Sequence, residues 1–270
     1  MDSSIQFPPF SADSRGNKLK SYDIRDHKGD PNSMLMLCGP EEVIAQIAAV
    51  AKGSCVERSL NGKGRERWTH ALYFQNGVSQ EIADLCEDLT ELLSIPNSAS
   101  IDLSLSLDWY KQADDEGELV HTPAGQLIYR TKYANNPTWS SSRQARRDLL
   151  KAMSSTIETH PILARSQVIS APPGSKGDGT SFGEILGQDV AKQSGREFMP
   201  MIGPARAPQK EQIGRNVRDD FELSEVDWGA VLLIDDVFHT GVTLESAARA
   251  ARRAGASEVF ALTAARTLRK

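Results

Sequence analysis

The stretch Val231-Leu-Leu-Ile-Asp-Asp-Val-Phe-His-Thr-Gly-Val-Thr243 decides the fold class of this chain. Residues 231 to 234 form the apolar run that is typical of a strand buried on both faces of a sheet. The alanine-rich segment 244 to 254 follows, with Gly255 directly after it, and this pattern predicts a helix. A buried strand that leads into a helix indicates an α/β protein, in which ligands bind at the carboxyl ends of parallel strands.

The loop after this strand has the residue types that a phosphate group needs. Gly241 allows close approach of the backbone, the amides at the helix start point outward, and the hydroxyls of Thr240 and Thr243 add donors. Asp235 and Asp236 suit instead the hydroxyls of an adjacent sugar, or a divalent cation that prefers oxygen ligands. The alternative is an ordinary strand, turn and helix whose acidic side chains are merely solvated.

Residues 231 to 243 resemble the phosphoribosyl pyrophosphate (PRPP) binding motif of type I phosphoribosyltransferases, an aliphatic strand followed by two acids and Thr-Gly-x-Thr. The resemblance implies that Asp235 and Asp236 bind the ribose 2′ and 3′ hydroxyls and Mg²⁺, and that the next seven residues hold the 5′-phosphate. That phosphate loop consists of Val237, Phe238, His239, Thr240, Gly241, Val242 and Thr243. His239 stands where the family most often has threonine, and we expect its imidazole to lie at the rim of the site.

Composition and charge exclude several classes of protein. The chain has 270 residues, of which 25% are charged and 39% hydrophobic, as in ordinary globular proteins. No stretch approaches the roughly 18 apolar residues of a membrane helix, and residues 1 to 10 lack the features of a secretory signal, so we expect a cytoplasmic protein without a membrane partner. A net charge of −5 disfavours nonspecific nucleic-acid binding as the main role and leaves a local basic patch possible in principle.

The cysteines indicate neither a disulfide framework nor a zinc site. The chain has three of them, Cys38, Cys55 and Cys86, and no Cys-x-x-Cys pair. We expect these side chains to act as small buried hydrophobes.

The pattern of residues 1 to 124 predicts an α+β region, in which we identify no resemblance to a family. Strands are expected over 34 to 38, 69 to 74 and, half-exposed, 101 to 109, helices over 41 to 52 and 79 to 93, and a hairpin that returns through 119 to 128. The basic run from Lys63 to Arg67, before Trp68, is interpreted as a solvated loop, with a phosphate or nucleic-acid contact as the alternative.

From residue 125 onward the chain is similar to the ComF-like (competence protein) branch of the family. Residues 127 to 133 fit that branch's Ile-x-x-x-Lys-Tyr pattern, with Lys132 on its lysine, and Arg266 closes the resemblance after a final strand over 258 to 263. The resemblance implies a type I phosphoribosyltransferase-like parallel sheet flanked by helices over 125 to 270. In this family a hood outside the core holds the acceptor, so the resemblance indicates the region 1 to 124 as the candidate hood. The alternative is a domain that binds a partner.

Residues 172 to 180 are predicted to form the pyrophosphate-binding loop, between a core strand over 167 to 171 and a helix that begins with the capping box Ser181-Phe-Gly-Glu184. The loop includes Pro172, Pro173, Gly174 and Ser175, and Lys176 is expected to neutralise the leaving group. A nucleotide-binding P-loop is set aside, because Thr180 follows the second glycine where that motif needs lysine. ComF relatives have Arg-Gly-Phe-Asn where this chain has Thr180-Ser-Phe-Gly183, and the missing arginine affects turnover more than binding.

A long polar segment after a predicted strand over 198 to 202 resembles the mobile loop that closes over PRPP in this family. Its cations are Arg206, Lys210 and Arg215, and Ile213 stands where ComF relatives usually have another arginine. Long loops of this kind often shield reactions from water. The alternative is three solvated side chains on the surface.

Two functions are consistent with these patterns. The first is an enzyme that transfers phosphoribose from PRPP to a small nitrogenous acceptor in nucleotide metabolism, with Asp235, Asp236, Lys176 and Lys210 as its catalytic residues and Mg²⁺ as its cofactor. The second is a PRPP- or nucleotide-sensing module that has lost turnover. The resemblance also implies a homodimer as a candidate assembly, because dimers are common in this family.

Overall fold

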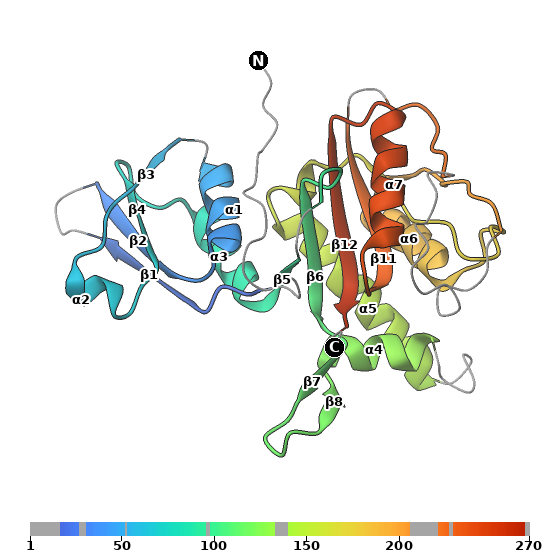
Figure 1. The fold of residues 1–270 in the computed structure, drawn as a ribbon, viewed down its shortest axis with the longest axis horizontal. Coiled ribbons are helices and arrows are strands. Elements are labelled where there is room, and N and C mark those ends of the chain that lie inside the picture. Colours follow the sequence, from blue (N-terminus) through green and yellow to red (C-terminus); the bar gives the residue numbers. More distant parts are fainter. Residues whose placement is uncertain are drawn as a thin grey trace.

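The computed structural model describes residues 17–26, 31–51, 53–95, 98–132, 140–205, 221–226 and 229–267. The strands within these ranges form a six-stranded sheet, a four-stranded sheet and a two-stranded hairpin. Helices α1 (Glu41–Ala51) and α3 (Gln80–Glu91) lie between the two larger sheets (Figure 1).

The six-stranded sheet confirms the predicted α/β class. Its strand order is β10-β9-β11-β12-β6-β5, in which the neighbours from β10 to β6 run parallel and β5 runs antiparallel to β6. The strands are β5 (Leu93–Ile95), β6 (Leu103–Trp109), β9 (Val168–Ser170), β10 (Glu197–Phe198), β11 (Ala230–Phe238) and β12 (Glu258–Arg266).

Helices cover both faces of this sheet, which explains the continuous apolar run at the start of β11. Leu232 and Ile234 pack in a core cluster with side chains of three helices, whereas Val231 and Leu233 pack in a second cluster with the last helix. The three helices are α4 (Pro123–Lys132), α5 (Ser140–Thr159) and α6 (Phe182–Gln193), the last is α7 (Val242–Arg253), and the turn η1 (Leu163–Arg165) leads from α5 to β9. Successive strand residues point to opposite faces, so neither face tolerates polar side chains here.

Strand β6 corrects the prediction of a half-exposed strand. It pairs with β12, and its serines Ser104 and Ser106 are as buried as the leucines between them. The alternation of serine and leucine resembled a strand with one wet face, but a small hydroxyl fits inside a sheet that is covered on both sides. Because β6 and β5 come from the region before residue 124, the six-stranded sheet extends across the predicted domain boundary.

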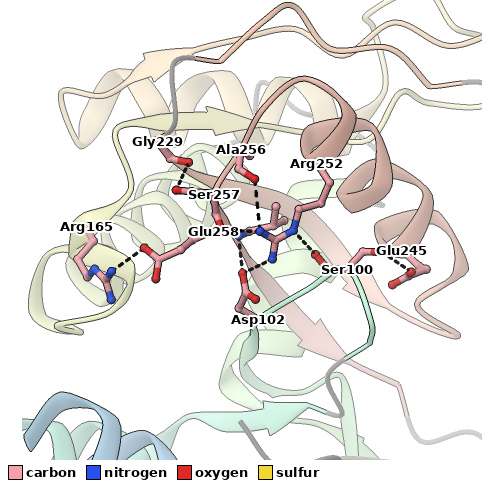
Figure 2. Close-up of polar contacts among 10 residues, drawn as sticks. Ser100, Asp102, Arg165, Gly229, Glu245, Arg252, Ala256, Ser257 and Glu258 are labelled. Atoms are coloured by element: carbon pink, nitrogen blue, oxygen red, sulfur yellow. Dashed lines mark hydrogen bonds and ion pairs between the residues drawn. The ribbon is translucent and has the colours of Figure 1, made fainter. Parts of the chain in front are cut away.

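A polar network at the amino-terminal edge of the sheet fixes β6 beside β12 (Figure 2). The guanidinium of Arg252, near the end of α7, forms an ion pair with Asp102 and donates to the carbonyl oxygens of Ser100 (3.3 Å) and Ser257 (2.5 Å). Asp102 Oδ2 also accepts a hydrogen bond of 2.8 Å from the amide of Val259. One arginine thus connects the segment before β6 to both α7 and β12.

The amino-terminal unit is a separate antiparallel sheet in the order β1-β2-β4-β3. Its strands are β1 (Ser21–Asp26), β2 (Ser33–Cys38), β3 (Cys55–Glu57) and β4 (His70–Phe74), and a short helix α2 (Gly62–Arg65) precedes β4. Side chains of α1 and α3 pack with Leu35, Leu37 and Leu72 in one core cluster, so both helices cover the same face of the sheet. The two strands and two helices predicted over 34 to 93 are confirmed as β2, α1, β4 and α3, but α3 ends at Glu91 and Leu93 belongs to β5. Lys52, predicted in the first helix, lies outside the described residues, and β3 and α2 were not predicted.

The predicted return of the chain through 119 to 128 is half right. Strand β7 (Lys111–Ala113) pairs with β8 (Leu119–His121) in a hairpin, but residues 123 to 128 belong to α4. The helix begins there because Pro123 suits the first helical position and the hydroxyl of Thr122 accepts a hydrogen bond of 3.1 Å from the amide of Gly125.

The expectation that the cysteines are buried is confirmed for one of the three. Cys86 is buried, which raises the pKa of its thiol to about 12, and Cys38 and Cys55 are partly exposed. Among the described residues, no helix combines the length and the apolar character needed to cross a membrane.

Candidate functional site

The two loops assigned to PRPP from the sequence meet at one edge of the six-stranded sheet. Strands β9 and β11 are adjacent and parallel, so their carboxyl ends lie together. From β9 the chain passes through α6 to β10 on one side, and from β11 it passes through α7 to β12 on the other side. Such a reversal of direction opens a crevice at the carboxyl ends of the strands, where ligands bind in open α/β sheets.

The boundary of the phosphate loop differs from the prediction. Val237 and Phe238 continue β11 and pair with Ala265 and Arg266 of β12, so the turn comprises only residues 239 to 241. Helix α7 then begins at Val242. The strand is longer than its aliphatic run because the backbone of β12 pairs with it beyond the acids.

The acidic pair therefore lies in the last part of β11, and the two carboxylates have different surroundings. Asp236 is 8% exposed, and its carboxylate forms an ion pair with Lys132 of α4 and accepts a hydrogen bond of 2.9 Å from the amide of Val237. Asp235 is only partly exposed and accepts a hydrogen bond of 2.8 Å from the amide of Asp236. A Cβ atom on Gly183, in the first turn of α6, would lie 2.8 Å from Asp235 Oδ1, so that helix start needs glycine beside the carboxylate.

Electrostatics favours a partner with donors or positive charge at this pair. Burial, and next the negative charge of Asp236, raise the pKa of Asp235 well above its usual range. Sugar hydroxyls can donate hydrogen bonds to a carboxylate. A divalent cation offsets the repulsion between two neighbouring carboxylates. The arrangement thus suits either a ribose, a hard cation, or both together.

The turn after β11 forms the wall of a small open hollow. Gly241 has a φ of 77°, and a Cβ atom there would lie 2.6 Å from the ring of Phe238, so both its backbone conformation and its surroundings require glycine. The hollow is lined by Asp235, Val237, Phe238, His239, Thr240, Gly241, Thr243 and Leu244. It therefore brings one acid and the start of α7 together with six of the seven phosphate-loop residues. The seventh, the exposed Val242, does not line it.

Arg266, the last residue of β12, and Thr267, which follows it, hold this turn in place. The buried guanidinium of Arg266 donates to the carbonyl oxygens of Phe238 (3.1 Å) and His239, and its central carbon lies 4.6 Å from the centre of the Phe238 ring. The hydroxyl of Thr267 lies 3.1 Å from His239 Nδ1, so the imidazole faces the end of β12. His239 is exposed, in agreement with a position at the rim.

Replacing Arg266 with methionine is expected to lower the free energy of unfolding by about 1–3 kcal/mol, because the carbonyl groups of Phe238 and His239 lose a charged donor. Urea denaturation measures this loss. Arg146→Met, which removes an exposed ion pair with Asp189, provides the control and is expected to cost no more than about 1 kcal/mol. Equal losses in the two variants would contradict the positioning role of Arg266.

The predicted pyrophosphate loop is connected to the start of α6 by Glu184. The capping box is present as predicted, with the amide of Glu184 donating to the hydroxyl of Ser181 at 3.3 Å. Glu184 Oε2 also accepts hydrogen bonds from the amides of Ser181 (3.2 Å) and Gly174 (3.0 Å). The sequence indicated the cap but not the contact with Gly174, which links loop and helix.

The remaining loop residues lie as follows. Pro172 and Pro173 are buried, Ser175 is partly exposed and Lys176 is exposed. In the described part of the chain, no ion pair or hydrogen bond joins Lys176 to the acidic pair. Hydrogen bonds from Thr180, with a smaller contribution from the charge of Lys176, lower the pKa of Asp178. The loop therefore already contains one carboxylate close to its cation.

The residues predicted as cations of the mobile loop, Arg206, Lys210 and Arg215, lie outside the described residues, as does Ile213. The strand predicted before them is short, since β10 ends at Phe198 and only Ile202 forms a further bridge, with Glu222. Both flanks of this segment adjoin the pyrophosphate loop. A Cβ atom on Gly177 would lie 3.2 Å from the amide of Ala205, and one on Gly203 would lie within 3 Å of both Phe221 and Pro173.

The candidate protein ligands for a metal ion at this site are the carboxylates of Asp235 and Asp236. Among the described residues, His, Cys, Asp and Glu side chains form no group of three or more that could hold a metal ion. Mg²⁺ commonly binds through one or two carboxylates and completes its coordination with water and substrate phosphates. Asp235 and Asp236 fit such a substrate-dependent site.

Comparisons with known proteins are of limited extent. No protein-family model matches the chain. A segment of 52 residues is 40% identical to a protein of Lactococcus lactis subsp. lactis (strain IL1403) that has provisionally been given the name ribose-phosphate pyrophosphokinase 2. The matched segment makes up 19% of this chain and 16% of that protein, so the chain spans about a sixth of the length of this relative.

Several solved structures show partial similarity. An adenine phosphoribosyltransferase from Leishmania tarentolae is 19% identical, with a TM-score of 0.35 and coverage of 62% of this chain and 77% of that chain. An adenine phosphoribosyltransferase from Saccharomyces cerevisiae is 18% identical, with a TM-score of 0.34 and coverage of 57% and 82%. An orotate phosphoribosyltransferase from Aeropyrum pernix is 18% identical, with a TM-score of 0.31 and coverage of 57% and 71%. TM-scores of this size establish neither a common fold nor a common activity.

Proposed function

We propose that this protein binds PRPP and transfers its phosphoribosyl group to a nitrogenous acceptor, with release of pyrophosphate. One observation carries the proposal. Adjacent carboxylates, Asp235 and Asp236, lie in the last part of a buried parallel strand that leads into a glycine turn and a helix start, at the point where the sheet reverses its strand order. This combination suits a sugar that carries a phosphate on one side and a second anionic group on the other.

Each part of the donor has a candidate partner. The ribose hydroxyls donate to Asp235 and Asp236, and the 5′-phosphate lies in the hollow at the start of α7, where Thr240 and Thr243 add hydroxyl donors. The pyrophosphate lies against the loop 172 to 180 and the start of α6. Binding both ends of the donor orients the carbon that reacts, C1′.

The reaction breaks the bond between C1′ and a pyrophosphate oxygen and forms a bond between C1′ and a nitrogen of the acceptor. The sugar passes through a state with oxocarbenium character, and the bonding electrons leave with pyrophosphate. Lys176 is proposed to balance the charge that the leaving group gains, together with Lys210, Arg206 and Arg215. Mg²⁺ held by Asp235 and Asp236 would supply further positive charge at the pyrophosphate and ribose oxygens.

The acceptor is proposed to lie beside the hairpin and α4, which follow the carboxyl end of β6 at the same edge of the sheet. Tyr110, His121 and Tyr129 form an aromatic group there, with ring centres 4.8 Å apart in the first pair and 5.1 Å in the second. Tyr129 is 46% exposed and lies one helical turn before Lys132, whose ammonium contacts Asp236. A flat nitrogenous base can stack on such a ring.

A PRPP-sensing module without turnover is the second candidate, and the departure at Thr180 favours it. Thr180 stands where ComF relatives have the arginine of the pyrophosphate loop, and the loss of this arginine affects turnover more than binding. The ComF-like branch, the homodimer, the cytoplasmic location and the hood formed from residues before 124 stay predictions.

Isothermal titration calorimetry and a pyrophosphate-release assay separate these functions. A transferase is expected to bind PRPP with Mg²⁺ and to release pyrophosphate only when one base of a panel of purines and pyrimidines is added. Saturable binding without release for any base would favour the sensor. Absence of binding at millimolar PRPP with Mg²⁺ would contradict both functions.

A further inference from the structure

One face of the four-stranded sheet carries only the short helix α2 and the residues that flank it, where Trp68 packs with Met36 and Ala71. Helices α1 and α3 cover the opposite face and lie toward the six-stranded sheet, where Gln46 of α1 donates a hydrogen bond of 2.7 Å to Ser94 of β5 (Figure 1). The face that bears α2 therefore points away from the candidate active site. We refer to it as the open face and define it by Arg25, Met34, Val56, Arg58, Lys63, Arg65, Arg67, Trp68 and Tyr73.

Strand register places the centre of the open face. Arg25 of β1 pairs with Met34 of β2, Met34 pairs with Tyr73 of β4, and Tyr73 pairs with Val56 of β3. Directly paired residues point to the same side of a sheet, so the four side chains form one row across it. Val56 is 52% exposed, and Met34 and Tyr73 are partly exposed, so the row offers an apolar and aromatic strip to solvent.

Cations surround this row. Arg58, Lys63, Arg65 and Arg67 are exposed, and within the part of the chain that the structure describes no ion pair joins any of them to a carboxylate. Arg25 is balanced by Asp23, and Glu57 follows Val56 on the strand and so points to the other face. Among the acids near these cations, Glu66 is exposed next to Arg65. The local excess of positive charge contrasts with a net charge of −5 for the whole chain.

Two of these arginines are held in a conformation that suits phosphate groups. The guanidinium carbon of Arg58 lies 5.1 Å from the centre of the Tyr73 ring, and that of Arg67 lies 4.9 Å from the ring of the buried Trp68. A guanidinium stacked on a ring keeps its N–H groups in the exposed plane, where they can bind a phosphate in a bidentate manner. The stacking also reduces the conformational freedom that binding would remove.

We propose that the open face binds single-stranded nucleic acid, with Arg58, Lys63, Arg65 and Arg67 on the phosphates. A base stacks on the pair formed by Tyr73 and the Arg58 guanidinium that lies over its ring. Exposed bases and a flexible phosphate backbone match a flat sheet that has an aromatic ring at its centre and cations around it. An acidic polypeptide would use the cations alone and gain little from the ring. The proposal is independent of PRPP binding, because the open face and the site at the end of β11 belong to different sheets.

Fluorescence anisotropy with labelled oligothymidylate and oligouridylate, at several salt concentrations, tests this inference. The full chain is expected to bind at low salt, and Tyr73→Ala is expected to weaken binding by about 10-fold while Tyr73→Phe retains it. Each of Arg58→Gln and Arg67→Gln is expected to reduce the slope of log affinity against log salt by about 0.7. Lys192→Gln, which removes an exposed cation of α6, is the matched control and is expected to leave the affinity unchanged.

Several results would overturn the inference. The first is absence of oligonucleotide binding at low salt, and the second is an equal effect of Tyr73→Ala and Lys192→Gln on the affinity. The third is competition by polyglutamate that is as strong as competition by the oligonucleotides, which would indicate an acidic polypeptide as partner. Self-association that Arg58→Gln and Arg67→Gln abolish, without any oligonucleotide binding, would assign the face to a second copy of the chain. Far-UV circular dichroism of each variant separates these outcomes from unfolding, and unchanged PRPP titration separates them from a failure of the proposed transferase.

Discussion

Replacing both Asp235 and Asp236 with asparagine is expected to lower the affinity for PRPP by about 100-fold or more. Hydrogen bonds to a charged group contribute about 1.5–3 kcal/mol each, and about 1.4 kcal/mol corresponds to a tenfold change in affinity. Asparagine also holds Mg²⁺ more weakly than a carboxylate does, so pyrophosphate release is expected to fall at least as far. Calorimetric titration with PRPP and Mg²⁺ measures the first effect, and a single-turnover assay measures the second.

The substitution at position 235 is expected to lower the PRPP affinity without destabilising the folded protein. Burial and the charge of Asp236 raise the pKa of Asp235, so the folded state is destabilised by keeping that carboxylate ionised, and a neutral amide removes this cost. Asp235→Asn alone is therefore expected to unfold at the same or a higher urea concentration. Asp189→Asn, which removes a carboxylate from the surface of α6, serves as the control for binding. PRPP affinity that is equal in the control and in the double variant would exclude the acids from the donor site.

Replacing Leu105 with alanine is expected to lower the free energy of unfolding by about 2–5 kcal/mol, the usual range for a buried leucine. Leu105 is fully buried in β6, pairs with Leu262 of β12 and belongs to the core cluster that α4, α5 and α6 share. Urea denaturation followed by tryptophan fluorescence and by circular dichroism measures the change. Because the residue supports β12, PRPP binding is expected to weaken at urea concentrations that leave the wild-type protein folded.

Val120→Ala provides the comparison for this core substitution. Val120 lies in β8 of the hairpin and is 47% exposed, so its truncation removes little buried surface and is expected to change stability by less than about 1 kcal/mol. A similar small effect at Leu105 would mean that β6 contributes little to the six-stranded sheet. The two substitutions thus test the position of β6 independently of any ligand.

The sequence predicted the parts of the site that are continuous in the chain. The aliphatic run, the acids and the glycine turn lie within thirteen residues, and their order alone indicates a strand end, a helix start and a ligand between them. The capping box at Ser181 and the helix that follows it were likewise local patterns. Local propensity and side-chain chemistry were sufficient in these places.

Contacts between distant segments could not be predicted in the same way. Lys132 contacts an acid 104 residues later, and nothing near Lys132 in the sequence indicates that partner, although the ComF-like pattern drew attention to the residue. Arg266 closes a predicted strand, and only the pairing of β12 with β11 shows that its guanidinium reaches the turn after Phe238. The burial of β6 was missed because serine and leucine alternate there as they do in a strand with one wet face.

The position of β6 has a consequence for how the chain can be divided. A fragment that starts at residue 125 would keep the donor site but leave the outer backbone N–H and C=O groups of β12 without β6 as their neighbour. Unprotected strand edges recruit extended segments from other molecules, which promotes aggregation and domain swapping. The region before residue 124 thus shields the carboxy-terminal half from intermolecular sheet growth, apart from any role in recognising an acceptor.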